Sequence, residues 1–397
     1  MDLKIDIRFR YLLASRALRS IALIYMSLAF SLYLAALHIS IINIGIVAAA
    51  TMLFMIFLTM LLGYIGDRKG YKKEVILAEA LAFLGALIIG ISTYPWLVIT
   101  GMIIAGLSGS AGGMRGAFSP GTNALIAGSY SDERERMHKY SFITMTASGS
   151  AVGGSILFSS VSFIEKSVGL VEAYRLLYIA SALMLFISML FLFMLNEAKR
   201  PEKTTRMMKA SSMKYSLRVI TANTLGGIGI GIFMPLLPLW FKLMYNASTF
   251  KIGIVFTSVY IATAFGSYLS SRMAHKLDAI NTASYTRLAS GILLFCMAIS
   301  PLLVIAGIIY IVRALIAGFG SPSRTTVSVR GIDAEDYGTA TSVQGIASRM
   351  AQLSSVASGY AMDYALPLPI VIGGIFQLAS GISYKLLFKK SKAIAKS

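Results

Sequence analysis

Two arginines, Arg313 and Arg349, stand deep inside long apolar runs, where a charged side chain is costly. At 1.5 Å per helical residue, both positions lie near the middle of a helix long enough to cross a bilayer. A charge at that depth costs a few kcal/mol or more, so an ionisable residue there is a functional candidate. Because a guanidinium presents a planar fork of donors that suits carboxylate or phosphate, we expect both arginines to bind an anionic organic solute.

Either arginine could instead bond backbone carbonyls or an acidic neighbour and serve structure alone. Other polar residues in the apolar runs could complete a binding site by supplying amides, hydroxyls and aromatic walls. They are Gln344 and Gln352, which flank Arg349, with Tyr25, Tyr33 and Tyr260 in two further runs.

Carboxylates are scarce in these runs, and that scarcity bears on the solute. Glu79 is the only Asp or Glu well inside a predicted span. A proton-coupled exporter of cationic drugs ordinarily needs a membrane carboxylate that exchanges protons for cations. We therefore expect a small organic solute, preferably anionic, and keep proton-coupled multidrug export as the alternative function.

The composition explains why such runs exist. Of 397 residues, 56% are hydrophobic and 13% charged, and the mean hydropathy is +0.74. Soluble domains carry roughly a quarter charged residues, and a bilayer needs roughly 20 apolar residues per helical span. The sequence therefore predicts twelve transmembrane helices, at about 17–38, 41–65, 75–93, 95–119, 140–163, 172–195, 216–244, 251–272, 280–300, 302–321, 338–363 and 366–387.

The net charge of +19 would suggest a nucleic-acid partner in a soluble protein. Here the basic residues concentrate in alternate loops and in both termini, as cytoplasmic loops of membrane proteins do. We therefore expect no nucleic acid as partner. The distribution predicts a multi-pass protein of the plasma membrane with both termini in the cytoplasm.

The longest polar stretch, 196–215, falls close to the midpoint of the chain and predicts a linker between residues 1–195 and 216–397. The two halves also resemble each other. The segment that begins at Pro95 (PWLVITG) matches the one at Pro301 (PLLVIAG), and Gly116-Ala-Phe-Ser-Pro matches Gly318-Phe-Gly-Ser-Pro. Such parallel repeats enclose a binding site at their interface, near the bilayer midplane.

The loop after the second span reads Gly63-Tyr-Ile-Gly-Asp-Arg-Lys-Gly-Tyr-Lys-Lys. This string resembles the signature loop of the major facilitator superfamily (MFS), and it stands between spans two and three as it does in that family. The resemblance implies an all-α polytopic membrane protein, with twelve transmembrane helices in two pseudo-symmetric six-helix bundles. It also implies secondary active transport by rocker-switch alternating access, with helices ten and eleven lining the cavity and helix three at the periphery.

The same resemblance assigns gating roles. Asp67 should dock near Tyr337 and Gly338 at the start of the eleventh helix, and Arg115 is a candidate partner for it. Glycines 63 and 66 are expected to allow close helix approach. In the second half, Arg272 keeps the basic residue of the loop but the acidic one is lost. The gating set is Gly63, Asp67, Arg68, Gly70, Lys72, Arg115 and Arg272.

An enzyme is not expected, because the chain has no phosphate-binding loop and only three histidines. No cofactor is required for alternating access. The expected partners are the lipid bilayer, a small-molecule substrate and a coupling proton or other ion, and we expect a monomer. A lipid-translocating protein is a less favoured alternative. Pro235 and Pro238 should bend or unwind the outer end of the seventh helix.

Overall fold

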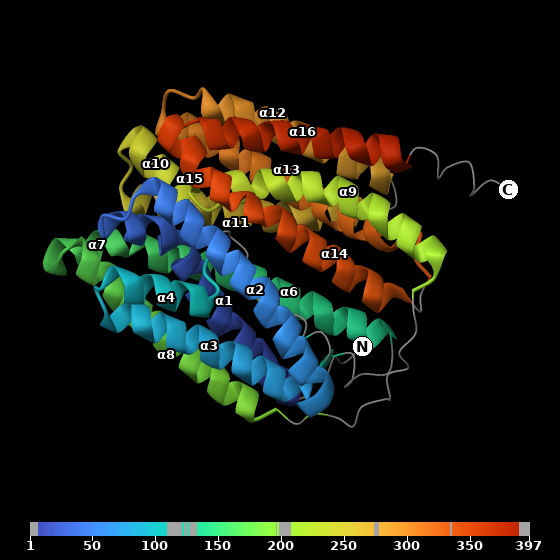
Figure 1. Ribbon diagram of the computed structural model, residues 1–397, viewed down its shortest axis with the longest axis horizontal. Helices are drawn as coiled ribbons and strands as arrows, with labels where there is room; N and C mark the ends of the chain where they lie inside the picture. Colours follow the sequence, from blue (N-terminus) through green and yellow to red (C-terminus); the bar gives the residue numbers. More distant parts are fainter. Residues whose placement is uncertain are drawn as a thin grey trace. The chain divides into compact units, whose positions relative to one another are not determined.

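The computed structural model describes residues 7–108, 121–122, 125–126, 133–195, 197, 208–273, 278–333 and 336–388. Within these ranges every regular element is a helix (Figure 1). Contacts divide the chain into two compact units. Unit 1 comprises Met1–Lys203 with Ser248–Thr257, and unit 2 comprises Thr204–Ala247 with Ser258–Ser397.

Unit 1 contains seven of the described helices. They are α1 (Ile7–Ala36), α2 (Ile41–Lys69), α3 (Tyr71–Ile91), α4 (Pro95–Ala105), α6 (Glu133–Ser159), α7 (Val161–Val168) and α8 (Leu170–Phe193).

In unit 2, two of the predicted spans are each divided into shorter helices. The helical elements of this unit are α9 (Ala210–Phe233), α10 (Leu237–Tyr245), most of α11 (Thr249–Met273), α12 (Ala279–Ala298), α13 (Leu303–Val329), α14 (Tyr337–Ala351), the 3-10 turn η3 (Gln352–Ser354), α15 (Ser355–Tyr364) and α16 (Leu368–Phe388).

Among the described residues, nine helical segments are long and apolar enough to cross a membrane: α1, α2, α3, α6 continued by α7, α8, α9, α11, α13 and α16. The other three predicted spans coincide with α4, α12 and the pair α14 and α15. Of the span predicted at 95–119, the structure describes α4, which has 11 residues, while 109–120 lie outside the described residues. The count of twelve spans therefore stays a prediction.

The predicted interruption of the seventh span is confirmed. Helix α9 ends at Phe233, and α10 begins at Leu237 with Pro238 in its first turn. Proline lacks the backbone donor that a continuous helix needs, so the two prolines separate the helices.

The interruption of the eleventh predicted span, 338–363, was not predicted. Helix α14 ends at Ala351 and gives way to the turn η3 at Gln352, where the chain also bonds to α9. The Ser354 hydroxyl donates to the Ile228 carbonyl at 2.8 Å. A Cβ at Gly231 would lie 2.4 Å from Ser354 Oγ, so only glycine permits this approach.

Gly227 and Gly231 of α9 are both close-packing positions. A Cβ at Gly227 would lie 2.9 Å from the Cβ of Ala351.

Close contact through glycine recurs within each unit. In unit 1, a Cβ at Gly85 of α3 would lie 2.5 Å from the carbonyl oxygen of Gly101 in α4. In unit 2, α12 and α16 run side by side (Figure 1), and a Cβ at Gly291 would lie 2.9 Å from the Gly374 carbonyl oxygen. Small residues let backbones approach in lipid, where packing rather than water exclusion holds helices together.

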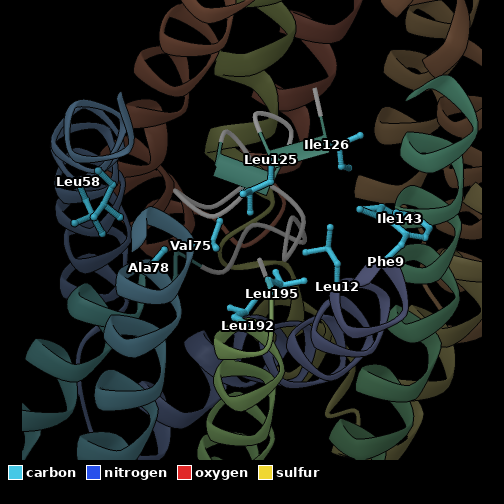
Figure 2. Packing of buried hydrophobic residues seen from close by; sticks show 11 residues of the cluster. Phe9, Leu12, Leu58, Val75, Ala78, Leu125, Ile126, Ile143, Leu192 and Leu195 are labelled. Carbon is cyan, nitrogen blue, oxygen red and sulfur yellow. The ribbon is translucent and has the colours of Figure 1, made fainter. Parts of the chain in front are cut away.

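One end of unit 1 is filled by an apolar cluster that joins several helices (Figure 2). Phe9 of α1 and Ile143 of α6 lie on one side of it, and Val75 of α3 lies near Leu192 at the end of α8. The cluster is next to the junction of α2 and α3, so it fixes the loop that carries the signature string. Its buried members are Phe9, Leu12, Leu58, Leu62, Val75, Ala78, Leu125, Ile126, Ile143, Leu192 and Leu195.

Candidate functional site

Arg313 of α13 is buried inside unit 2, with 7% of its surface exposed. Its guanidinium carbon lies 4.9 Å from the ring centroid of Phe233 and 5.7 Å from that of Tyr310. No acidic side chain of the described residues pairs with it, and its Nε has no hydrogen-bond partner among them. Arg313 is therefore a buried cation that contacts aromatic rings and has no counter-charge among the described residues.

The local fold explains this position. Tyr310 precedes Arg313 by one turn of α13, so both side chains lie on the same face of the helix. The Tyr310 hydroxyl donates to Met234 Sδ at 3.3 Å, which ties α13 to the residue after α9. Phe233 is the last residue of α9, so the guanidinium lies against the point where that helix ends.

Gln344 lies apart from Arg313. Its Nε2 donates to Ser216 Oγ at 3.2 Å and to the Ser328 carbonyl at 3.1 Å. Ser328 is about 20 Å further along α13 than Arg313, at 1.5 Å per residue. The amide of Gln344 therefore joins α14 to α9 and α13 away from the buried cation. Arg349 is half-buried on α14 and has interactions of its own.

Gln352 approaches the same turn of α9 as Arg313, but from another side. A Cβ at Gly231 would lie 2.9 Å from the Cα and the carbonyl oxygen of Gln352. Gly231 and Phe233 project about 200° apart at 100° per residue. Gln352 and Arg313 therefore flank the last turn of α9, which stands between them.

A groove lies between α9 and α14 in unit 2, beside the interruption at η3. Its volume is about 490 Å³, which is within the range of small-molecule sites. The wall is mostly apolar, with two hydroxyls. The lining residues are Thr224, Ile228, Ala347, Met350, Ala351 and Ser354.

Two of the three predicted site tyrosines pack inside unit 1. The Tyr25 hydroxyl donates to the Tyr174 carbonyl at 2.9 Å. The Tyr33 ring lies 5.4 Å from the rings of Tyr174 and Tyr178, and its hydroxyl has no hydrogen-bond partner among the described residues. Both tyrosines thus fix α1 against α8.

Tyr260, the third predicted tyrosine, belongs to unit 2. Its hydroxyl is buried and has no hydrogen-bond partner among the described residues. Of the three tyrosines, Tyr260 is therefore the one that belongs to the same unit as Arg313.

The signature loop joins α2 to α3 through Gly70, whose φ of 114° lies in the region that favours glycine. Gly66 confirms the expected close approach, because a Cβ there would lie 2.1 Å from Glu74 Oε2. For Gly63 the structure shows no such approach: among the described residues, nothing lies within 4 Å of its Cβ position. The helix turns that meet near Gly66 do not extend to Gly63.

The basic residues of the loop pack on aromatic rings and carbonyls. The Arg68 guanidinium lies 4.5 Å from the Tyr64 ring centroid, and in unit 2 Arg272 lies 5.3 Å from that of Tyr268. Lys72 donates from Nζ to the Phe193 carbonyl at 2.8 Å. The predicted contacts of the Asp67 side chain and of Arg115 fall outside the described residues.

Sequence reasoning missed Glu197, which caps the N-terminus of α3. Its carboxylate accepts hydrogen bonds from the backbone amides of Tyr71 at 2.9 Å and Lys72 at 3.3 Å. A carboxylate at a helix N-terminus satisfies free amides and the helix dipole. No pattern links residues so distant in the chain.

A buried ion pair in unit 1 was also missed. Arg19 of α1 pairs with Glu79 of α3, and their side chains are 4% and 0% exposed. Arg16, one turn earlier on α1, is buried as well. The signal was present, because a carboxylate inside a span needs a cation nearby. Within the described residues, no group of His, Cys, Asp and Glu could hold a metal ion.

The model of the family described as "Major Facilitator Superfamily" matches residues 12–356. The chain belongs to this superfamily. The match covers both units and includes the signature loop, Arg313 and Arg349.

Two curated relatives of this MFS chain are amine transporters. The chromaffin granule amine transporter of Rattus norvegicus is 23% identical over 65% of this chain and 48% of the relative. The synaptic vesicular amine transporter of Mus musculus is 20% identical over 64% of this chain and 48% of the relative. The chain spans about half the length of these relatives.

Solved structures share the fold. The POT family transporter PepTSo matches with a TM-score of 0.75 at 12% identity, over 97% of this chain and 98% of that one. A D-xylose-proton symporter matches with a TM-score of 0.69 at 14% identity, over 95% of this chain and 96% of the symporter. The nucleoside transporter NupG matches with a TM-score of 0.72 at 13% identity, over 95% of this chain and 100% of NupG. At such identities the likeness concerns the fold alone.

Proposed function

We propose that this chain is a secondary active transporter that moves a small organic solute, preferably an anion, across the membrane. The observation that carries the proposal is the buried guanidinium of Arg313, which has no acidic partner among the described residues. An anionic solute would supply the missing counter-charge.

The energetics favour a ligand over packing alone. A desolvated cation over aromatic rings gains about 2 kcal/mol, whereas burying a charge costs several kcal/mol per ion. The rings of Phe233 and Tyr310 therefore offset only part of the cost. A purely structural role for Arg313 would leave the remaining cost of burying its charge without compensation.

The proposed mechanism is alternating access between two six-helix halves, with both termini in the cytoplasm of a plasma-membrane protein. Arg313 and Arg349 bind the anionic group, and Gln344, Gln352, Tyr25, Tyr33 and Tyr260 belong to the candidate site. The loop with Asp67 and Arg68 latches one end state, together with Arg115, and Arg272 serves the weaker counterpart.

A second candidate is proton-coupled export of cationic amines, which is favoured by the names of the curated relatives. It requires a membrane carboxylate that is free to exchange a proton for a cation. Glu79 is a poor choice for that role because Arg19 already neutralises it. The ion pair of Glu79 with Arg19 therefore supports an anionic solute over a cationic amine.

The test is thermal stabilisation of the purified full chain by organic anions, phosphates, sugars, peptides and cationic amines, followed by uptake into proteoliposomes. At 100 times its dissociation constant, a ligand should add about 2.7 kcal/mol. Arg313→Ala and Arg349→Ala should abolish stabilisation by an anion. Arg330→Ala, at the exposed end of α13, is the matched control and should not.

Stabilisation by cationic amines that survives both substitutions would reject the anionic proposal and favour the exporter. Uptake of the stabilising solute into proteoliposomes would establish transport, which binding alone does not.

A further inference from the structure

Helices α12 and α16 of unit 2 run side by side (Figure 1) and are joined by a buried contact. The Ser284 hydroxyl of α12 donates to the Gly381 carbonyl of α16 at 2.7 Å. A Cβ at Gly381 would lie 2.8 Å from Leu288 Cγ, so a larger residue there would push the two helices apart. This contact fixes the position of the neighbouring residues on the surface of the pair.

Beside the contact, a lysine of one helix lies over a tyrosine of the other. Lys385 Nζ of α16 is 5.5 Å from the ring centroid of Tyr285 of α12. Tyr285 directly follows Ser284, and Lys385 follows Gly381 by about one helical turn. Both side chains are exposed. The two helices therefore present an ammonium and a phenol together at their surface.

The ammonium of Lys385 has no counter-charge among the described residues. No salt bridge between them includes Lys385, and neither α12 nor α16 contains an Asp or Glu. Asp278, which precedes α12, is about 10 Å further along the helix axis than Tyr285. Its carboxylate accepts the backbone amide of Asn281 and caps the helix. Lys385 is therefore available to an anion from outside the chain.

An apolar stripe leads along α16 to this lysine. Ile375, Ile382 and Leu386 are exposed and are spaced seven and four residues apart, so they share one face of the helix. On α12, the exposed Ile292 stands seven residues after Tyr285. Because α16 is long and apolar enough to cross a membrane, acyl chains would cover this face.

The length of the stripe places Lys385 at the depth of the lipid headgroups. Ile375 and Lys385 are ten residues apart, which is about 15 Å along a helix. The hydrocarbon core of a bilayer is about 30 Å thick, so the stripe has about the length of one leaflet. An acyl chain along the stripe would bring its headgroup to Lys385 and Tyr285.

The sequence after α16 adds positive charge at the same end. Residues 389–397 read KKSKAIAKS and contain four lysines and no acid. A basic residue in the last turn of a helix also stabilises the helix dipole, which would account for Lys385 but not for lysines beyond the helix. Clusters of basic residues directly after a membrane span are typical of segments that bind anionic lipids.

We propose that the end of α16 binds an anionic phospholipid, with Lys385 and Tyr285 at the centre of the site and the lysines of 389–397 beside them. The Lys385 ammonium pairs with the phosphate, and the Tyr285 hydroxyl donates to the phosphate or to an ester oxygen. The acyl chains lie on the apolar stripe. This inference goes beyond the proposed function, because it involves neither the solute nor Arg313.

Unit 2 offers a matched control for a general attraction of basic residues to lipid. Arg272, in the last turn of α11, lies 5.3 Å from the ring centroid of Tyr268, and both are exposed. This second pair also joins a cation to a tyrosine at a helix end. It comes from a single helix, and no run of lysines like 389–397 follows it.

The first experiment places a reporter in the site with Tyr285→Trp, in the full chain that also carries Trp96→Phe. Trp96 is 73% exposed, whereas Trp240 is 2% exposed and adds a constant background. The protein is reconstituted in mixtures of phosphatidylglycerol and phosphatidylcholine, of which one is brominated on its acyl chains close to the headgroup. Quenching of the introduced indole then gives the relative affinity of the site for the two lipids.

Phosphatidylglycerol should bind more than about tenfold tighter than phosphatidylcholine, because each lysine near the lipid surface contributes about fivefold and several are present. Lys385→Gln should lower this ratio about fivefold, and glutamine at Lys389, Lys390 and Lys392 should lower it further. Arg272→Gln should leave it unchanged. Equal affinities for the two lipids would overturn the inference, as would an equal loss with Arg272→Gln and Lys385→Gln.

The second experiment keeps Tyr285 in place and measures thermal unfolding in detergent. Phosphatidylglycerol should raise the Tm of the wild type with saturation, and phosphatidylcholine should raise it far less. Lys385→Gln and Tyr285→Leu should lose most of this rise, whereas Tyr268→Leu should keep it. An equal rise with inorganic phosphate would show that a soluble anion suffices and would overturn the lipid site. The proposed transport function would stand in each of these cases, since its test uses Arg313 and the solute panel.

Discussion

Each unit holds a buried arginine inside a helix that is long and apolar enough to span a membrane, and the two arginines differ in their partners. In unit 1, Arg19 pairs with Glu79, which is fully buried beside it. In unit 2, Arg313 contacts two aromatic rings and no acid of the described residues. A neutralised cation joins helices, whereas a cation without counter-charge can receive one from a ligand. This difference is why we propose that the binding chemistry lies in unit 2.

Unit 2 also holds an arginine that bonds an amide instead of an acid. Arg287 donates to Gln377 Oε1 at 2.7 Å, and Gln377 donates to the Gly226 carbonyl at 3.1 Å. This network joins α9, α12 and α16 through an amide. Arg313 makes no such bond to an amide of the described residues.

The largest expected effect is in unit 1. Glu79→Gln should lower the free energy of unfolding by about 3–5 kcal/mol, because it leaves a buried cation uncompensated. Reversible unfolding in detergent would measure it. The control is Glu172→Gln, which breaks the exposed pair with Arg175 and should cost less than about 1 kcal/mol.

If Glu79→Gln and Glu172→Gln lower the free energy of unfolding equally, the pair of Arg19 and Glu79 does not stabilise unit 1 as a buried ion pair. A double variant, Arg19→Met with Glu79→Leu, should recover most of the loss, since an apolar pair can replace a buried ion pair.

Arg313→Met should act in the opposite direction. Removing a cation without counter-charge should raise the free energy of unfolding of the ligand-free protein by about 1–3 kcal/mol, less what the contact with Phe233 contributes. The same variant should lose stabilisation by anions. A destabilisation as large as that of Glu79→Gln would show that Arg313 has a structural partner and would remove the contrast between the units.

The signature loop and its counterpart offer a smaller contrast. Gly66→Ala should cost about 1–3 kcal/mol, because its Cβ collides with Glu74, whereas Gly63→Ala should be neutral or stabilising by up to about 1 kcal/mol. Ser270 of unit 2 stands two residues before Arg272, as Gly66 stands two residues before Arg68. It already carries a Cβ and is buried, so Ser270→Ala should change stability little. Equal effects of the two alanines on thermal unfolding would contradict this packing.

The smallest effects concern the exposed arginines. Arg68→Met and Arg272→Met should each lower stability by less than about 1 kcal/mol, since each loses one exposed contact with a tyrosine ring. If Arg68→Met nonetheless slows transport in proteoliposomes far more than Arg272→Met, the loop of unit 1 is the stronger latch. Equal rates would contradict the proposed difference between the two loops.

Much of the helical layout could be predicted from composition and from a few local signals. Apolar runs predicted the nine helices that can cross a membrane, and Pro235 with Pro238 predicted the end of α9. The interruption at Gln352 could not be predicted, because the contacts made there, such as the bond from Ser354 to a carbonyl of α9, join it to another helix. Such a contact leaves no trace in the periodicity of its own segment.

The sequence by itself determined that this chain is a helical membrane protein, because lipid tolerates only runs whose backbone bonds are internal and whose side chains are apolar. It also marked Arg313 and Glu79 as unusual, since charge is costly in such runs. Only the tertiary structure decided that Glu79 meets Arg19 while Arg313 meets rings. The rotation of each helix about its axis determines which charges meet, and packing between distant segments sets that rotation.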